Sequence, residues 1–216
     1  MSIRVRRRQL WRIVDKGMER RVRKLKIINH MSLDGVIQNS PEDGFPYTDW
    51  GAPYRSLEGR DFMLQAYGER YDALIGRRTY DMWSTFWPRV PAGDPFADRL
   101  RVATKYVVTH RPESLTWGPF ESVGPDLVEG VRQVKESNGP DLVCCGSSTL
   151  TSALIQHGLV DELVLPINPV VVGAGKRLFA EGTPGRTFQL ASTTALPSGI
   201  VVCAYTLGEP LQALRT

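Results

Sequence analysis

The sequence of 216 residues contains little cysteine and little histidine, with three residues of each type. The cysteines are Cys144, Cys145 and Cys203, of which two are adjacent. A small odd number with an adjacent pair does not suit a disulfide framework, and no spacing links these cysteines to histidines as zinc ligands. We therefore predict reduced core cysteines, no metal site and a cytoplasmic protein.

Long apolar runs are also absent. None approaches the roughly 18–20 residues that cross a bilayer, and the N-terminal residues do not resemble a secretory signal. The phosphate-binding consensus G-x-x-x-x-G-K-[ST], the dinucleotide fingerprint G-x-G-x-x-G and the zinc-deaminase pattern H-x-E…P-C-x-x-C do not occur. The sequence therefore predicts a protein outside the membrane that lacks these three kinds of site.

Positive charge is concentrated at the start of the chain. Residues 1–26 hold 11 Lys or Arg and two Asp or Glu, whereas the remaining residues hold 16 and 21. We therefore predict a dispensable basic arm at residues 1–23, a single domain at 24–208 and a short tail at 209–216. Binding of nucleic acid through the arm is the alternative, because a basic segment neutralises phosphates. No pattern of basic and aromatic residues in the body supports it.

Apolar runs alternate with segments of helical periodicity along the body. We expect strands at 25–31, 73–75, 105–109, 120–123, 141–145 and 160–168, and helices at 56–70, 77–86, 126–137 and 148–157. Prolines between residues 88 and 95 predict an irregular connection, and residues 187–193 and 200–207 predict a closing antiparallel pair. This order is typical of an α/β protein with a mostly parallel sheet covered by helices on both faces.

The most informative motif follows the predicted strand at 73–75. That strand runs through Gly76 into Arg77, Arg78 and Thr79, which begin a helix. The start of a helix exposes unpaired backbone N–H groups and attracts anions, and arginine forks suit phosphate. The motif therefore predicts a site for a phosphorylated ligand, with an ordinary strand-to-helix junction and solvated arginines as the alternative.

Other polar segments also follow predicted strands. They are Ser32 with Asp34, Thr109–Arg111 and Gly146–Thr149. In a parallel sheet ligands bind beyond the carboxyl ends of the strands, so we expect these segments to converge with the Gly76 turn.

Five segments between residues 24 and 207 carry a resemblance to a known family. They are Met31–Gly35 (MSLDG), Ala73–Tyr80 (ALIGRRTY), Val143–Leu150 (VCCGSSTL), Val160–Leu163 (VDEL) and Gly173–Phe179 (GAGKRLF). With these motifs in this order, the chain resembles the dihydrofolate-reductase superfamily. It is most similar to the C-terminal reductase domain of bifunctional riboflavin-biosynthesis proteins. The resemblance implies a dihydrofolate-reductase-like three-layer α/β/α fold and a homodimer formed through the C-terminal strands.

The resemblance also implies an NADPH-dependent reductase with three cofactor-binding turns. They are Gly76, Arg77, Arg78 and Thr79 for the cofactor phosphates, Thr109, His110 and Arg111 for the adenosine 2′-phosphate, and Gly146, Ser147, Ser148, Thr149 and Leu150 for the pyrophosphate and nicotinamide. Dihydrofolate reductases proper have two glycines at the third turn, where this chain has Gly146-Ser147, so the riboflavin-type branch is favoured. As an alternative, Ser147 and Ser148 cap the following helix.

The substrate-binding residues predicted with this reductase are Ser32, Asp34, Trp50, Asp61 and Lys176. Asp34 and Asp61 are the candidates for a catalytic or ring-binding carboxylate, with a turn aspartate and a solvated helix acid as the alternatives. The implied reaction is hydride transfer to a small heterocyclic or ribosylamino substrate. 5-Amino-6-(5-phosphoribosylamino)uracil is one candidate, and a folate, pterin or specialised metabolite is the alternative. A non-catalytic cofactor sensor is a remoter alternative.

Overall fold

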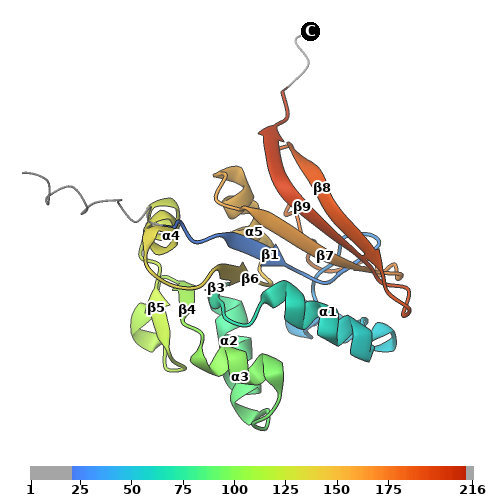
Figure 1. Cartoon of the computed structure of the whole chain (residues 1–216), viewed down its shortest axis with the longest axis horizontal. Coiled ribbons are helices and arrows are strands. Elements are labelled where there is room, and N and C mark those ends of the chain that lie inside the picture. Colours follow the sequence, from blue (N-terminus) through green and yellow to red (C-terminus); the bar gives the residue numbers. More distant parts are fainter. Residues whose placement is uncertain (1–20, 213–216) are drawn as a thin grey trace, which may run out of the picture.

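In the computed structural model, residues 21–212 are described and form one mixed sheet between two layers of helices (Figure 1). The strands are β1 (Leu25–Ile28), β2 (Met31–Ser32), β3 (Asp72–Gly76), β4 (Lys105–Val108), β5 (Phe120–Ser122), β6 (Leu142–Cys144), β7 (Glu162–Asn168), β8 (Arg186–Ala195) and β9 (Val201–Pro210). Their order is β5-β4-β3-β6-β1-β7-β9-β8, with β2 beside β7. Pairs from β5 to β7 are parallel, and β9 is antiparallel to both neighbours. The predicted sheet is confirmed.

Five α-helices cover the two faces of the sheet. They are α1 (Leu57–Tyr67), α2 (Arg77–Phe86), α3 (Pro95–Val102), α4 (Leu127–Glu136) and α5 (Ser148–Gln156). Short 3-10 helices lie at Glu42–Gly44, Ala52–Tyr54, Trp87–Arg89 and Pro112–Ser114. Within residues 21–212, no helix is long and apolar enough to cross a membrane.

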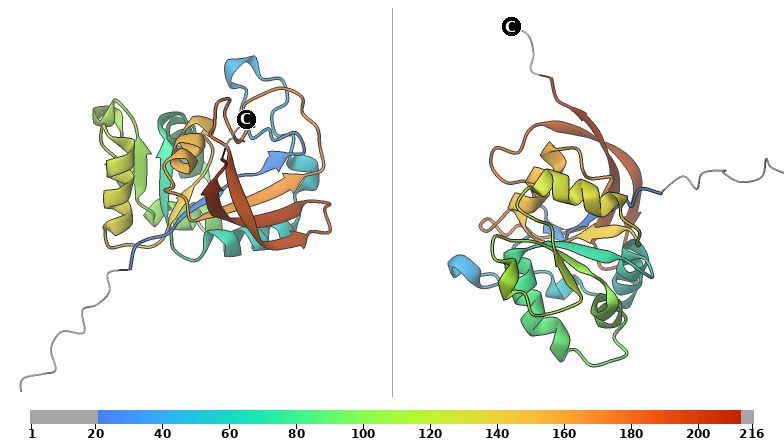
Figure 2. Two further views of the ribbon diagram at one scale, coloured as in Figure 1. Left: turned by 90° about the horizontal axis from the view of Figure 1, so that it is seen from above. Right: turned by 90° about the vertical axis from the view of Figure 1, so that its left-hand side faces the viewer.

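The alternation of side chains along β1 shows how the layers are held together. Leu25 and Ile27 pack in one core cluster with residues of α4 and α5, whereas Ile28 packs in the other with residues of α1, α2 and α3. Successive side chains of a strand point to opposite faces, so a strand with apolar side chains on both faces must be covered twice. The right-hand view of Figure 2 shows α4 and α5 on one side of the sheet and the green helices α2 and α3 on the other. The predicted three-layer arrangement is confirmed.

The connection at residues 88–94 is irregular as expected, but helix α3, which begins at Pro95, was not predicted. Asp94 is its N-cap and accepts hydrogen bonds from the N–H groups of Phe96 and Ala97, both at 3.0 Å. Pro95 occupies the first helical position, where an N–H would have no partner within the helix and where the fixed φ of proline suits helical geometry. Asp-Pro was therefore the signal for the start of a helix rather than for a loop.

The boundary of the predicted basic arm also changes. Arg23 is 2% exposed, and its guanidinium contacts the Asp72 carboxylate at 2.5 Å and the Ser137 hydroxyl at 3.1 Å. Arg23 therefore belongs to the domain. At the other end, β9 continues to Pro210, past the predicted domain end at residue 208. The predictions for residues 1–20 and 213–216 lie outside the described residues.

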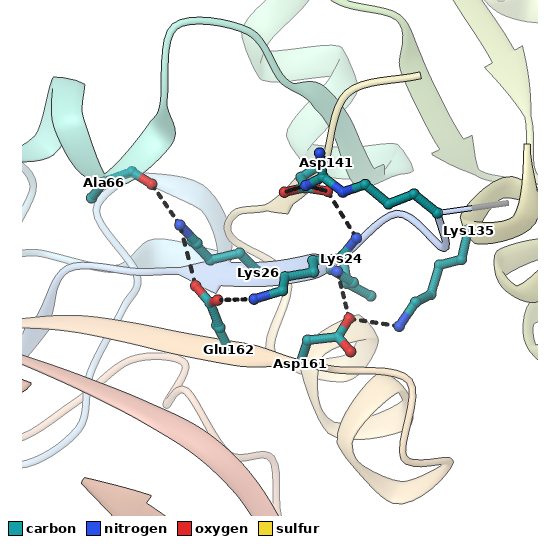
Figure 3. A network of polar contacts seen from close by, with 9 residues as sticks. Lys24, Lys26, Ala66, Lys135, Asp141, Asp161 and Glu162 are labelled. Atoms are coloured by element: carbon teal, nitrogen blue, oxygen red, sulfur yellow. Dashed lines mark hydrogen bonds and ion pairs between the residues drawn. The ribbon is translucent and has the colours of Figure 1, made fainter. Parts of the chain in front are cut away.

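A network of charged groups surrounds the amino end of β1 (Figure 3). Lys24 Nζ and Lys26 Nζ contact Glu162 at 3.0 and 3.3 Å. The backbone N–H of Leu25 donates to Asp161 at 2.7 Å, and Lys135 Nζ contacts the same carboxylate at 2.6 Å. These contacts fix the amino end of the central strand, opposite the end where the predicted ligand turns lie.

Candidate functional site

Two of the predicted turns are in direct contact. Because β3 and β6 are parallel neighbours, the turns that leave them meet at one edge of the sheet. A Cβ placed on Gly76 would lie 3.2 Å from Ser147 Oγ, and a Cβ on Gly146 would lie 2.8 Å from Thr79 Oγ1. Gly146 also has a φ of +69°, which favours glycine. Glycine is therefore needed at position 146, whereas a side chain at position 76 would require Ser147 to shift by a few tenths of an ångström.

Arg77 joins this pair to the third turn. Its Nη1 donates to the Arg111 carbonyl at 3.1 Å and to the Ser114 hydroxyl at 2.5 Å, and its Nε donates to Asp81 at 2.8 Å. The three segments predicted as cofactor turns are thus brought together. Much of the Arg77 guanidinium is already used to connect them.

The other basic side chains of these turns are more accessible. Arg78 has a side chain that is 71% exposed, and its contact with Asp43 is 3.5 Å long. His110 and Arg111 are exposed, and neither side chain has a polar partner within residues 21–212. Thr109 Oγ1 accepts a hydrogen bond from the Arg111 N–H at 3.1 Å and so shapes the turn.

The two helices that begin at these turns differ in their caps. Helix α2 has no side-chain cap at Gly76 and carries two arginines but no acid in its first turn. Helix α5 is capped by Ser147, whose hydroxyl accepts from the Leu150 N–H at 3.3 Å. The capping alternative therefore holds for Ser147. The N–H groups of Ser148 and Thr149 have no partner among the described residues, so they remain available to a ligand.

Asn29 is a residue of this region that the sequence did not reveal. Its Oδ1 accepts a hydrogen bond from the Gly146 N–H at 2.7 Å, which connects the ends of β1 and β6. Its Nδ2 is buried and has no partner in the described part of the chain. The only local signal was a polar pair, Asn29-His30, directly after an apolar strand.

A cavity of about 780 Å³ lies between α1, the loop before it and strands β7 and β9. It is lined by His30, Ile37, Asn39, Trp50, Gly51, Tyr54, Arg55, Ser56, Leu57, Gly59, Arg60, Met63, Tyr67, Trp87, Phe96, Pro166, Asn168, Leu196, Ile200 and Val202. Its volume is in the range of small-molecule sites. None of the three turns lines it, but Asn29 contacts one turn and the next residue, His30, lines the cavity.

The charged groups of the cavity are compensated. Arg55 Nη1 donates to Asp49 at 3.1 Å, and Arg60 Nη2 contacts Asp94 at 3.0 Å. Desolvation of the imidazole by surrounding groups, with a smaller effect of the Arg55 charge, lowers the pKa of His30 to about 4. His30 is therefore neutral at physiological pH, although the residue as a whole is exposed.

The predicted substrate residues have different positions. Trp50 lines the cavity, and its Nε1 donates to the Gln38 carbonyl at 2.7 Å. Asp61 is exposed and lies outside the cavity, so a role in ring binding is not supported by its place on α1. Lys176 does not line the cavity either, and its Nζ contacts Asp43 at 2.6 Å.

Ser32 and Asp34 serve the structure of a turn. Ser32 is 0% exposed, so it cannot touch a substrate as predicted. Its hydroxyl donates to Asp34 at 2.6 Å and accepts from the Val36 N–H at 2.9 Å. Asp34 also accepts from the N–H groups of Val172 and Gly173 at 3.0 and 2.8 Å. These hydrogen bonds hold the pKa of Asp34 far below its usual range, so this carboxylate is unsuited to donate a proton and instead anchors the loop.

The family model named RibD C-terminal domain matches residues 23–202. The chain belongs to this family. Uncharacterized protein YyaP of Bacillus subtilis (strain 168) is 27% identical over 177 residues, which cover 81% of this chain and 90% of YyaP. The superfamily resemblance and the fold expected from the sequence are therefore confirmed.

Two solved structures share the fold. A putative riboflavin biosynthesis protein from Shewanella sp. PV-4 has a TM-score of 0.66 and 20% identity, covering 86% of this chain and 99% of that one. A diaminohydroxyphosphoribosylaminopyrimidine deaminase/5-amino-6-(5-phosphoribosylamino)uracil reductase from Thermotoga maritima has a TM-score of 0.61 and 13% identity. The match covers 86% of this chain and 57% of that one. At these identities the likeness concerns the fold alone.

Proposed function

We propose that this protein is an NADPH-dependent reductase that transfers a hydride to a small organic molecule. The observation that carries the proposal is the junction of three strand ends, where the turns at Gly76, Arg111 and Gly146 meet next to a cavity of substrate size. In open α/β sheets, the crevice beyond the carboxyl ends of the strands is the usual ligand site.

The residues at the junction suit a phosphorylated dinucleotide. Helix α2 begins with two arginines and no cap, although cations are unfavourable at the positive end of a helix dipole. A bound phosphate would compensate both the dipole and the unpaired N–H groups. The exposed guanidinium of Arg111 would bind the 2′-phosphate that distinguishes NADPH from NADH.

The protein's own contribution to the reaction is orientation and exclusion of water. A bound dihydronicotinamide supplies the hydride, whereas the chain positions it against the substrate. Asn29 fixes the Gly146 turn, the next residue, His30, lines the cavity, and Trp50 forms another part of the cavity wall. No carboxylate lines the cavity among the described residues, so water is proposed as the proton source.

The name of the Thermotoga relative suggests one acceptor to test, 5-amino-6-(5-phosphoribosylamino)uracil. Folates and pterins are further test compounds.

We also propose a homodimer, supported by the ten-residue strand β8, which ends the sheet and is largely exposed. A strand of this length at an edge presents unpaired N–H and C=O groups to a second strand. Reduced cysteines support a cytoplasmic location, because Cys144, Cys145 and Cys203 are all buried thiols.

Titration of the whole chain with NADPH and with NADH tests the proposal, with the fluorescence of the nucleotide as the readout. We expect micromolar binding of NADPH and binding of NADH that is weaker by about tenfold or more, because one charge-assisted contact is lost. Failure of both nucleotides to bind below millimolar concentration would reject the reductase function.

A further inference from the structure

The proposed reductase function leaves open the chemistry of the hydride acceptor, which the cavity restricts. We infer that the acceptor is a flat, uncharged and largely apolar carbonyl compound, such as a quinone, without a phosphate. This inference rests on the proposed function for the reaction itself, but the ligand class follows from the cavity lining.

The cavity has no partner for a pyrimidine or pterin ring of the amidine type. Such a ring presents an N–C–N edge with donors, which a buried carboxylate binds strongly. No Asp or Glu lines the cavity among the described residues. The sequence candidate for this task, Asp61, is exposed and outside the cavity. A donor-rich ring would lose its hydrogen bonds to water in this cavity without replacement, which is costly.

The cavity also lacks an uncommitted cation for a phosphate. Its basic residues are His30, Arg55 and Arg60. Arg55 is paired with Asp49 and Arg60 with Asp94, so each arginine is already neutralised by a carboxylate. His30 is neutral because its pKa is about 4. A dianionic phosphate would therefore have to displace an existing ion pair.

The remaining lining favours an apolar aromatic molecule with carbonyl oxygens as hydrogen-bond acceptors. Twelve of the 20 lining residues are apolar or aromatic, among them Trp50, Tyr67, Trp87 and Phe96. Three uncharged polar groups of the lining lack a polar partner among residues 21–212, namely the side chains of His30 and Asn39 and the indole N–H of Trp87. Asn168 is less available, because its Nδ2 donates to the carbonyls of Met31 and Pro166 at 3.1 Å each. His30 and Asn39 are suited to hydrogen-bond a carbonyl oxygen while the ring system packs on the aromatic walls.

The reaction balances with groups that the proposal names. A quinone gains one hydride and one proton from water and becomes a hydroquinone, while NADPH loses two electrons and becomes NADP⁺. The new bond forms between the hydride and the quinone, and the C–H bond at C4 of the nicotinamide breaks. No further oxidant or reductant is required.

Binding of 9,10-phenanthrenequinone to the whole chain tests the ligand class without the cofactor. Quenching of tryptophan fluorescence reports it, because Trp50 and Trp87 line the cavity. We expect saturable micromolar binding, and no binding of 5-amino-6-(5-phosphoribosylamino)uracil or dihydrofolate at the same concentrations. Leu196→Asp places a charge in the lining and should weaken quinone binding by about tenfold or more. Val102→Asp is the control, because Val102 is 78% exposed on α3 and lies outside the cavity.

The outcomes separate the inference from the proposed function. Quinone binding that depends on Leu196, together with quinone-dependent oxidation of NADPH, supports both. Binding and reduction of the phosphorylated uracil in preference to the quinone overturn the inference and leave the reductase function intact. The inference is also overturned if wild type and Leu196→Asp bind the quinone equally well. Thermal unfolding midpoints must show in that case that both proteins are folded. Leu196-dependent quinone binding without any nucleotide binding supports the ligand class and rejects the reductase.

Discussion

The side-chain oxygen of Asn29 accepts a hydrogen bond of 2.7 Å from the backbone N–H of Gly146. This contact ties the end of β1 to the turn after β6, one residue before the cavity wall at His30. It is the most direct link between the proposed cofactor turns and the proposed substrate cavity, so its removal should affect both stability and nucleotide binding.

Replacement of Asn29 by Ala leaves the Gly146 N–H without its acceptor. We expect a loss of about 0.5–1.5 kcal/mol in the free energy of unfolding, because the hydrogen bond is only partly buried and that is the typical net contribution of one bond. NADPH affinity should fall by about tenfold, since the turn loses its fixed position. Urea unfolding and NADPH titration measure the two effects. Asn138→Ala is the control, because Asn138 is exposed. Unchanged NADPH affinity in Asn29→Ala would contradict the positioning role.

Arg111 and Arg77 should differ in their effects on cofactor choice. Arg111→Ala removes an exposed cation, so NADPH affinity should fall by about 1.5–3 kcal/mol while NADH affinity stays nearly constant. Arg77→Ala removes the connection to the Arg111 carbonyl and Ser114, so both nucleotides should bind more weakly to a similar extent. Parallel titrations distinguish the two, with Arg132→Ala on the exposed face of α4 as a control. Equal losses for Arg111→Ala would exclude the 2′-phosphate assignment.

Gly146→Ala tests whether the contact between two turns is needed. The φ of Gly146 is +69°, and a Cβ there would lie 2.8 Å from Thr79 Oγ1. Gly158 is a matched control, because its φ is +64° and a Cβ would meet nothing within 4 Å. Both variants should lose about 1–2 kcal/mol of stability from backbone strain. Only Gly146→Ala should lose more than that and bind NADPH more weakly. Identical stability and affinity in the two variants would show that the turns tolerate separation.

His30 makes stability depend on pH in a defined direction. Its pKa is about 4 in the folded protein and 6.5 ordinarily, so below pH 6.5 the unfolded chain binds a proton that the folded chain does not. The contribution of His30 to stability is therefore complete above pH 6.5 and is lost as the pH falls towards 4. His30→Gln should reduce the difference between urea midpoints at about pH 7 and about pH 5. His157→Gln, at an exposed position, should leave that difference unchanged. If His30→Gln has the same difference between urea midpoints at the two pH values as wild type, the lowered pKa of His30 is rejected.

Arg23 should be essential for stability, whereas Arg21 should not. Arg23 is buried against Asp72, and removal of one partner from such a pair costs about 3–5 kcal/mol. Arg21 is an exposed partner of Asp141, so Arg21→Ala should cost less than about 1 kcal/mol. Urea unfolding of Arg23→Ala and Arg21→Ala measures this contrast. Deletion of residues 1–20 tests the predicted dispensable arm, and a stability loss as large as that of Arg23→Ala would contradict the prediction.

Local patterns were sufficient for the strand–turn–helix units. Gly76 followed by Arg77 predicted both the end of β3 and the start of α2, because the residues that determine this junction are neighbours in the sequence. The cavity was less accessible to prediction. Helical periodicity does not show which face of α1 points towards the cavity. Asp61 was therefore predicted to bind substrate, whereas Arg60 and Met63 are the residues of this helix turn that line the cavity. The contact between Asn29 and Gly146 joins residues far apart in the sequence, and only the parallel pairing of β1 with β6 brings them together.

Strand β1 carries two separate functions at its ends. The charged network at Lys24 and Lys26 holds its amino end, and Asn29 with His30 forms part of the proposed site at its carboxyl end. Asn29 follows Lys24 by five positions, which corresponds to roughly 16 Å of extended chain. Substitutions this far apart usually act additively on free energy. Substitutions that strengthen the charged network should therefore raise the free energy of unfolding without changing ligand preference. This added stability would offset the loss caused by destabilising substitutions in the cavity.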